Sequence, residues 1–210
     1  MKGLLKKDWY MAKRYCRSYI LIVLVYGVLG SLPSGSFLRA LPGVMAAMIP
    51  VTILAYDERS HWEEYSMTLP VTAKQMVGSK YLLGIGFQLA ALLISTVSYV
   101  IYAKTNNCFS GPDFIGNMGS ILILSALAGS LCLPVMFRWG VEKGRIAYYA
   151  VIVLAMVISS VITALQENGV FTEVIPHGWA PLLLLAAAAA LELGSWRLSA
   201  RFYAKRRNEI

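Results

Sequence analysis

Six apolar stretches, each close to the length that crosses a lipid bilayer, constrain the fold of this chain more than any other feature. They cover residues 15–32, 37–56, 81–103, 114–137, 146–165 and 181–198. An α-helix needs about 20 residues to span the roughly 30 Å hydrocarbon layer. Because backbone polar groups inside a bilayer must be satisfied within the protein, these stretches predict six transmembrane helices. The predicted fold class is an all-α integral membrane protein.

The composition of the chain agrees with a membrane location. Of its 210 residues, 58% are hydrophobic and 14% are charged, whereas about 25% of the residues of a typical soluble domain are charged. The first apolar stretch follows basic residues, as in a signal peptide, but it lacks a clear small-residue cleavage site and five more stretches follow it. We therefore interpret it as a retained helix.

The basic residues are distributed very unevenly between the two sides of the predicted bundle. With the N-terminus inside, every lysine and arginine except Arg39 and Lys104 faces the cytoplasm. The positive-inside rule thus explains the net charge of +8, and no nucleic-acid partner is expected. Both termini are predicted to be cytoplasmic, and residues 1–210 are expected to form one membrane domain that ends in a basic tail over residues 199–210.

An amphipathic helix is predicted over residues 1–17. At about 100° per residue, its basic side chains gather on one side and apolar and aromatic side chains fill the other, with Asp8 as the exception. Such a helix is expected to lie in the membrane interface against lipid. A solvated basic flank that happens to be helical is the alternative. The residues that would hold the helix at the interface are Lys6, Lys7, Trp9, Lys13 and Arg14.

A dense charged and aromatic stretch separates the second span from the third. On a helix, Trp62, Tyr65 and Leu69 would fall at positions i, i+3 and i+7 and share one face. A short cytoplasmic helix that presents aromatic side chains among acids is suited to docking into a partner; an ordinary solvated loop is the alternative. The docking segment, residues 57–74, contains Asp57, Glu58, Trp62, Glu63, Glu64, Tyr65, Leu69, Pro70 and Lys74, with Pro70 expected to end the helix.

The sequence predicts no catalytic, metal or nucleotide site in this chain. His61 and His177 fall on opposite sides of the predicted membrane, so they cannot share a metal ion, and no His-Glu-x-x-His sequence occurs. The chain also contains no Gly-Lys dipeptide, which the phosphate-binding loop of an ATPase requires.

Few polar side chains fall deep inside the predicted spans. Glu192 and Gln88 are the candidates for a substrate pathway, because ionisable groups inside a membrane usually mark such paths. Glu192 lies only five residues before Arg197, so a structural role near the inner interface is the alternative. Pro50 lies inside the second span, where a proline kink can serve gating, although most such kinks are structural.

The stretch after the second span resembles one found in the permease subunits of ATP-binding cassette type-2 (ABC-2) transporters, especially the compact six-span permeases of Gram-positive bacteria. The resemblance lies in an acidic pair, a tryptophan, an "LP" sequence, a basic residue and a "KY" pair that opens the next span. The matching residues are Asp57, Glu58, Trp62, Leu69, Pro70, Val71, Lys74, Lys80 and Tyr81. Thr72 and Ala73 depart from the Ser-Arg pair that is common in the family, and Lys74 supplies the charge instead.

This resemblance implies the membrane half of an exporter in a bacterial plasma membrane. Its partners would be a separate cytoplasmic ATPase subunit, which would bind ATP and magnesium, and a second permease copy or a sister permease. The segment 57–74 would be the coupling helix that enters a cleft in the ATPase, and residues 1–17 the interfacial helix. The alternative is a stand-alone membrane immunity or sensor protein that binds a toxic peptide without transport; an intramembrane hydrolase is disfavoured by the scattered histidines and cysteines.

Overall fold

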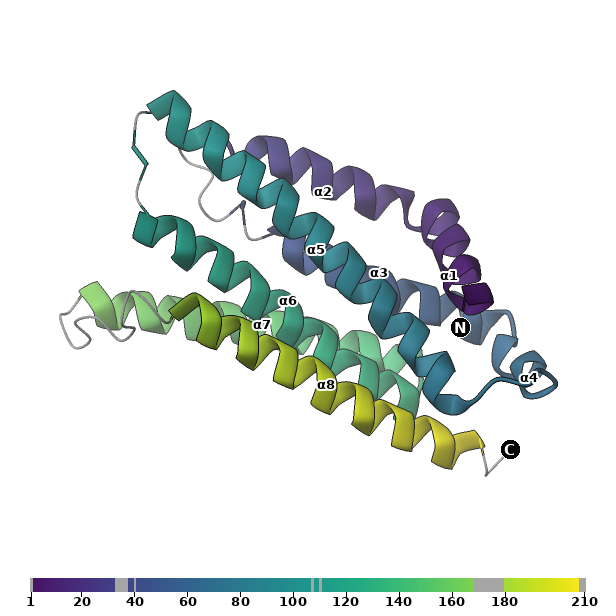
Figure 1. Ribbon diagram of the computed structural model, residues 1–210. Coiled ribbons are helices and arrows are strands. Elements are labelled where there is room, and N and C mark those ends of the chain that lie inside the picture. Colours follow the sequence, from purple (N-terminus) through teal and green to yellow (C-terminus); the bar gives the residue numbers. More distant parts are fainter. Residues whose placement is uncertain are drawn as a thin grey trace.

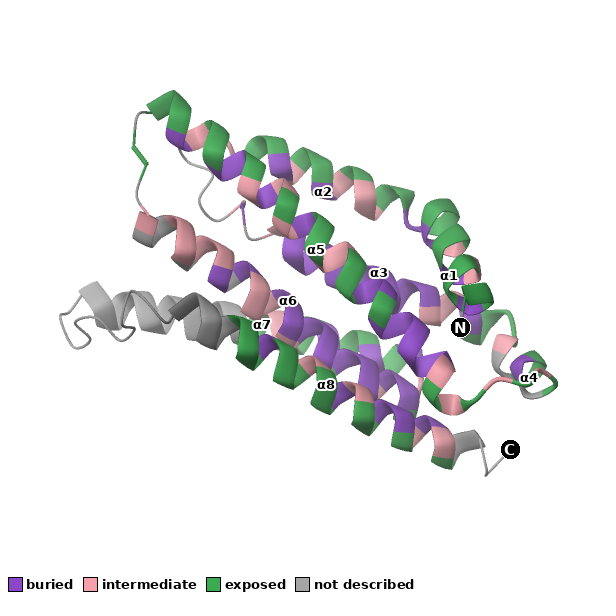
Figure 2. Ribbon diagram, viewed as in Figure 1, coloured by how far each residue is buried: buried purple, intermediate pink, exposed green. Residues whose placement is uncertain are grey.

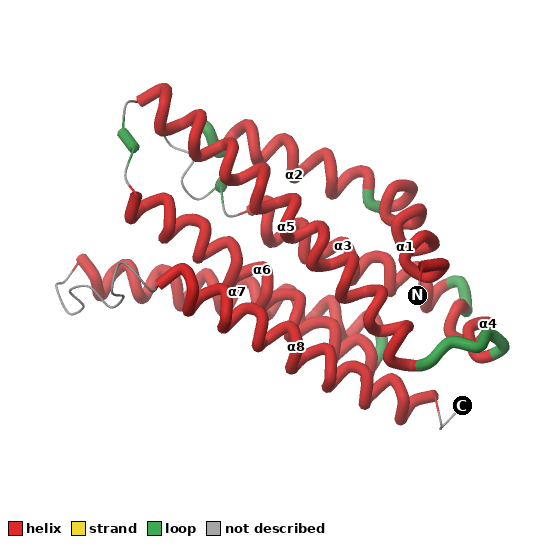
Figure 3. Tube along the Cα trace, in the orientation of Figure 1, coloured by secondary structure: helices red, strands yellow, loops and turns green. Residues whose placement is uncertain are grey.

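The computed structural model describes residues 2–32, 38–39, 41–106, 108–109, 111–167 and 180–207, apart from some side chains within them. All regular structure in these residues is helical (Figures 1 and 3). The helices are α1 (Lys2–Tyr15), α2 (Arg17–Leu29), α3 (Leu41–Arg59), α4 (Trp62–Met67), α5 (Ala73–Asn106), α6 (Gly111–Trp139), α7 (Val141–Glu167) and α8 (Ala180–Arg207). The predicted all-α fold class is confirmed.

Three of the described helices are long and apolar enough to cross a membrane, namely α3, α5 and the Asn117–Trp139 part of α6. Helix α2 is apolar but has only 13 residues, fewer than the roughly 20 that a span needs. The predicted spans 146–165 and 181–198 correspond to α7 and α8, although the side chains at the adjoining ends of these two helices lie outside the described residues.

The long helices form two groups that run side by side. Figure 1 shows α2, α3 and α5 in one group and α6, α7 and α8 in the other. The groups meet because α3 packs against α6 and α7, and α5 packs against α8. Between α3, α6 and α7 lies a core that contains the fully buried Val51, Cys132 and Tyr148. The Tyr148 hydroxyl donates to the Val44 carbonyl at 2.6 Å, which satisfies its only donor inside this core.

The outer surface of the bundle is apolar. Many large hydrophobic residues of α2, α5 and α7 are exposed (green in Figure 2), and Val28, Leu93 and Ile146 are each more than two-thirds exposed. A water-soluble monomer rarely exposes such continuous apolar surface. Lipid or another membrane-embedded chain must therefore cover these faces.

Helices α1 and α4, the first described residue and the last one all lie at the same end of the bundle (Figure 1). We call this the termini end. Two residues with left-handed backbones turn the chain there: His61 (φ 53°) between α3 and α4, and Gly140 (φ +89°) between α6 and α7. The basic residues that the sequence places in the cytoplasm lie toward the helix ends that meet at the termini end. Arg39 and Lys104 lie at the other end of the bundle.

The helix boundaries near α4 differ from the sequence prediction. Helix α4 ends at Met67, three residues before Pro70, so Leu69 does not share a helical face with Trp62 and Tyr65. A proline disfavours the helical conformation of the residue that precedes it, and Leu69, which precedes Pro70, lies in a non-helical connection. Helix α5 begins at Ala73, which places Lys74 in its first turn rather than in the docking segment.

Pro50 is fully buried inside α3. A Cβ atom added at Gly84 of α5 would lie 3.3 Å from the Pro50 Cγ, tighter than most carbon contacts in proteins. The glycine therefore lets α5 approach the proline ring closely. Pro50 of α3 thus packs against α5.

Candidate functional site

Two lysines and two aspartates from three helices meet in the interior of the termini end. The Lys80 ammonium of α5 lies 2.6 Å from Asp8 Oδ1 of α1 and also forms a short ion pair with Asp57 Oδ2 of α3. Lys7 Nζ lies 2.7 Å from Asp57 Oδ1 and 3.3 Å from Asp8 Oδ1. The Ser79 hydroxyl donates to the other oxygen of Asp8 at 2.9 Å. We call Lys7, Asp8, Asp57 and Lys80 the four-charge cluster.

The four-charge cluster balances two positive charges with two negative charges in a place where water is largely absent. Asp8 is 1% exposed, Lys80 3% and Asp57 5%. Buried charges are tolerated only when they are paired and hydrogen-bonded, and here each carboxylate accepts from more than one donor. Burial and the neighbouring Lys80 ammonium lower the pKa of Lys7, against the opposing effect of Asp57. The cluster therefore fixes α1 to α3 and α5 in one arrangement.

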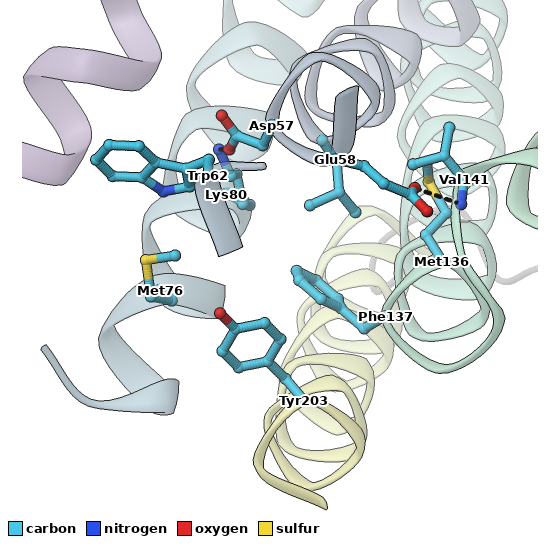
Figure 4. Close-up of a pocket in the computed structure, with 10 residues that line it drawn as sticks. Asp57, Glu58, Trp62, Met76, Lys80, Met136, Phe137, Val141 and Tyr203 are labelled. Atoms are coloured by element: carbon cyan, nitrogen blue, oxygen red, sulfur yellow. Dashed lines mark hydrogen bonds and ion pairs between the residues drawn. The ribbon is translucent and has the colours of Figure 1, made fainter. Parts of the chain in front are cut away.

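Trp62 connects α4 to this cluster. The Lys7 ammonium lies 4.0 Å from the centre of the Trp62 ring, in the geometry of a cation–π contact. The indole also packs against the apolar cluster that contains Met76, Phe137 and Tyr203. It lines a small cavity of about 40 Å³ beside Asp57 and Lys80 (Figure 4). Trp62 is thus the internal anchor of α4.

The outward side of α4 is formed by different residues. Tyr65 is 57% exposed and tilts against Trp62 with ring centres 5.4 Å apart. Glu64 is exposed, and its Oε1 lies 3.1 Å from Nδ1 of the exposed His61. Trp62, predicted to face a partner, is half-buried, and its ring packs against the chain's own helices. Asp57 is likewise buried, and the side chain of Glu63 lies outside the described residues.

Glu58 lies beside Asp57 but points toward a different helix (Figure 4). Its Oε2 accepts a hydrogen bond from the Val141 backbone N–H at 2.9 Å, at the first turn of α7. The N-terminal amides of a helix have no partner within the helix and carry a partial positive charge. Glu58 therefore satisfies one of these amides and ties the end of α3 to the start of α7.

Gly140 makes this contact possible, and its replacement by alanine is expected to destabilise the protein by about 1–2 kcal/mol. Its backbone is left-handed, and an added Cβ would lie 3.2 Å from Glu58 Oε1. Thermal unfolding of purified Gly140→Ala protein in detergent measures the effect. Gly3→Ala is the matched control, since a Cβ there meets nothing within 4 Å. Equal stability of the two variants would contradict the role assigned to Gly140.

Four of the five residues predicted to hold α1 at an interface are exposed: Lys6, Trp9, Lys13 and Arg14. The Trp9 ring stacks on Phe87 of α5 with centres 5.8 Å apart. Lys7 is the exception, because its ammonium points inward to Asp57. The buried side of α1 is formed by Leu4, Asp8 and Ala12.

The two residues predicted to mark a substrate pathway, Gln88 and Glu192, contact each other at a second polar site between α5, α6 and α8. Gln88 Nε2 of α5 lies 3.3 Å from Glu192 Oε1 of α8 and 3.2 Å from the Ser125 carbonyl of α6. A Cβ at Gly129 of α6 would lie 3.3 Å from the Gln88 amide nitrogen and 3.4 Å from Glu192 Oε1. The absence of a side chain at Gly129 thus leaves room for both polar groups. We call Gln88, Gly129 and Glu192 the polar notch.

Within the described residues, no three His, Cys, Asp or Glu side chains are grouped so that they could hold a metal ion. His177 lies outside these residues. Asp8, Asp57, Glu58 and Glu192 instead each contact a residue of another helix.

Sequence reasoning missed the partners of the four-charge cluster. From the sequence, Asp8 is an exception on a basic helix, Lys7 is an interfacial residue, and Lys80 is a cytoplasmic charge and a motif residue, so none of them is predicted to pair with another. One signal was available: Leu4, Asp8 and Ala12 are spaced by four residues, which places them on one face of a helix. An acid on the otherwise apolar face of a helix calls for a buried basic partner.

No curated protein and no solved structure matches this chain. A family model described as "ABC-2 family transporter protein" matches residues 3–204. Together with the long apolar helices, this match shows that the chain is a membrane permease component and belongs to the ABC-2 transporter family.

Proposed function

We propose that this chain is the membrane-spanning subunit of an ATP-driven exporter, and that α4 receives the movement of a separate ATPase subunit. The single observation that carries this proposal is the double-sided contact of α4. Its outer side presents Tyr65 and Glu64, while its inner side places Trp62 against Lys7 of the four-charge cluster. A force on the outer side would therefore reach α1, α3 and α5 together.

The proposed transmission depends on rigid contacts at one end of each helix. Asp57 and Glu58 are adjacent in α3 but bind different partners. Asp57 binds the lysines of α1 and α5, and Glu58 binds the first turn of α7. Displacement of this end of α3 would thus shift both helix groups. Alternating access requires this kind of coordinated change between two packings, driven by a ligand or partner that favours one of them.

The proposed topology has six spans with both termini in the cytoplasm of a bacterial cell. Its support is that α3, α5, α6, α7 and α8 each overlap one of the six apolar stretches over most of its length, and that the shorter α2 lies within the first stretch. The clustering of basic residues at the termini end supports this orientation through the positive-inside rule. In the resulting arrangement, α4 faces the cytoplasm, where an ATPase would be.

The ATPase subunit is proposed to bind the ATP and magnesium, because the chain has no Gly-Lys dipeptide for a phosphate-binding loop. The second permease, an identical copy or a sister chain, is proposed to cover part of the exposed apolar surface. The experiment is to purify the chain alone and together with an ABC ATPase encoded beside it, and to measure vanadate-sensitive ATP hydrolysis. Hydrolysis is expected only when the ATPase is present. Substantial hydrolysis by the chain alone would contradict the proposal.

Helix α1 is proposed to lie on the inner surface of the membrane. Changing Lys6, Lys13 and Arg14 to glutamine should remove roughly 1 kcal/mol of attraction to anionic lipid per charge, while the four-charge cluster stays intact. Transport by the ATPase complex in liposomes with and without anionic lipid measures the effect, and the variant should lose the stimulation by anionic lipid. The same lipid response in variant and parent would contradict the interfacial position of α1.

A further inference from the structure

An apolar groove lies between α2 and α5, which run side by side (Figure 1), and α3 forms part of its floor. Its volume is about 100 Å³, and every residue that lines it is apolar. Four buried residues form the floor, namely Val23, Ala46, Ile49 and Ala91. Two lining residues, Leu24 of α2 and Ala90 of α5, are exposed, so the groove is open to the surroundings of the bundle. We call it the α2–α5 groove.

The groove is closed at one end and reaches α1 at the other. At the closed end, the lining residue Ile94 lies against Gly27, and the Ser98 hydroxyl donates to the Gly27 carbonyl. At the other end, the lining residue Phe87 stacks on the exposed Trp9 of α1 with ring centres 5.8 Å apart. The groove thus extends along α5 from α1 to the place where α2 and α5 touch.

The groove lies at a depth that lipid acyl chains occupy. Phe87 and Ile94 follow Lys80 of the termini end by seven and fourteen residues, which correspond to about 10 and 21 Å along a helix axis. The hydrocarbon layer of a bilayer is roughly 30 Å thick. A chain that begins at the membrane surface on the termini end therefore reaches the groove.

The shape and lining of the groove select a narrow apolar occupant. Water fills a cavity when polar groups bind it, and an apolar cavity stays dry. A helix with its side chains is about 10–12 Å wide, so a second permease would cover the mouth without filling the groove. A hydrocarbon chain is both apolar and narrow.

Helix α1 adds positive charge beside the groove. Lys2, Lys6, Trp9 and Lys13 are separated by four, three and four residues, which places them along one side of α1, and all four are exposed. Trp9 of this side contacts Phe87 in the wall of the groove. The three lysines are thus arranged to attract the phosphate of an anionic lipid.

We propose that the α2–α5 groove binds one acyl chain of an anionic phospholipid whose headgroup contacts the lysines of α1. The lipid would connect α1 to α2 and α5. The headgroup contact rests on the proposed interfacial position of α1, whereas the acyl-chain site rests on the groove alone. Neither part depends on export or on an ATPase.

A phosphatidylglycerol with a photoreactive diazirine in its acyl chain tests the proposal on the purified full chain in phosphatidylcholine nanodiscs. Mass spectrometry of peptides locates the adducts after irradiation. Surrounding lipid reaches exposed residues such as Leu93, whereas Val23 and Ile49 are only 6% and 1% exposed and are reached from within the groove. Adducts at these two floor residues are expected. Their absence, with Leu93 labelled normally, would overturn the proposal, and no ATPase is present to affect the result.

Two variants fill the groove from different places. Ala90→Phe puts a ring at the mouth, and Ala91→Leu adds volume at the floor. Each should lower the labelling of the floor, relative to that of Leu93, at least about fivefold. Ala189→Phe, at an exposed position of α8, is the matched control and should label as the parent does. A smaller loss in either variant that elutes as a single folded species, or an equal loss in the control, would overturn the proposal.

The headgroup is tested with a second probe, a phosphatidylcholine with the same photoreactive chain. Phosphatidylglycerol is expected to label the floor of the groove about tenfold more strongly, and changing Lys2, Lys6 and Lys13 to glutamine should remove this preference. Lys104→Gln, at an exposed lysine on the opposite end of the bundle, is the control and should keep it. Equal labelling by the two probes, or a preference that survives in the triple variant, would overturn the assignment of an anionic lipid.

Discussion

Replacement of Lys80 by methionine is expected to lower the free energy of unfolding by about 3–5 kcal/mol. The ammonium of Lys80 lies between Asp8 and Asp57. Without it, two buried carboxylates would share the single charge of Lys7. Methionine fills a similar volume, so the loss is electrostatic rather than a matter of packing. Thermal unfolding of the purified protein in detergent or lipid nanodiscs measures it.

Lys74→Met is the matched control for this prediction. Lys74 belongs to the same helix but is exposed, so its replacement should change stability by less than about 0.5 kcal/mol. The double variant Asp57→Asn, Lys80→Met leaves the Lys7–Asp8 pair and should recover part of the loss. Equal stability of Lys80→Met and Lys74→Met would show that the four-charge cluster does not hold α1, α3 and α5 together.

Truncation of Trp62 to alanine is expected to affect both stability and partner binding. The indole packs on the apolar cluster with Met76 and Phe137 and stacks on the Lys7 ammonium. Removal of a half-buried tryptophan should cost about 2–3 kcal/mol, less than the 3–5 kcal/mol of a fully buried one. Because α4 would lose its internal anchor, binding to the ATPase should fall as well. Thermal unfolding and co-purification with the ATPase measure the two effects separately.

Tyr65→Ala separates the inner role of α4 from the outer one. Tyr65 is exposed, so its truncation should leave stability nearly unchanged. Because Tyr65 would be an aromatic anchor at the interface, its truncation should still cost about 2 kcal/mol of binding free energy for the ATPase. This corresponds to a roughly thirtyfold weaker affinity. Parental stability of Trp62→Ala, or parental ATPase binding by Tyr65→Ala, would contradict the assignment of the two sides of α4.

Much of the fold could be predicted because the membrane imposes simple rules on a sequence. The apolar stretches predict the long helices, since length and lack of charge are sufficient signals for a span. Gln88 and Glu192 could be singled out for a related reason, because polar residues are conspicuous inside apolar stretches. Their contact could not be predicted, since it depends on how α5, α6 and α8 pack.

The arrangement at the termini end was harder to predict for a physical reason. Charged residues near a membrane surface can be solvated, can contact lipid or can pair with each other, and the sequence alone does not distinguish these cases. The sequence predicts surface positions for Lys7 and Asp57, yet the two side chains bind each other across 50 positions of sequence. Trp62 was placed on an outer face because i, i+3 spacing fits a helix, but spacing does not tell which face of a short helix turns inward.

Photo-crosslinking from the outer side of α4 tests whether this helix contacts an ATPase subunit. A photoreactive phenylalanine analogue would replace Tyr65 in the chain while it is in complex with the ATPase. The same analogue at Leu93, which lies on the exposed apolar face of α5, is the control. If α4 docks on the ATPase through its outer side, position 65 will give a covalent adduct with the ATPase and position 93 will give none. An intact, hydrolysing complex that yields no ATPase adduct from position 65 would contradict it.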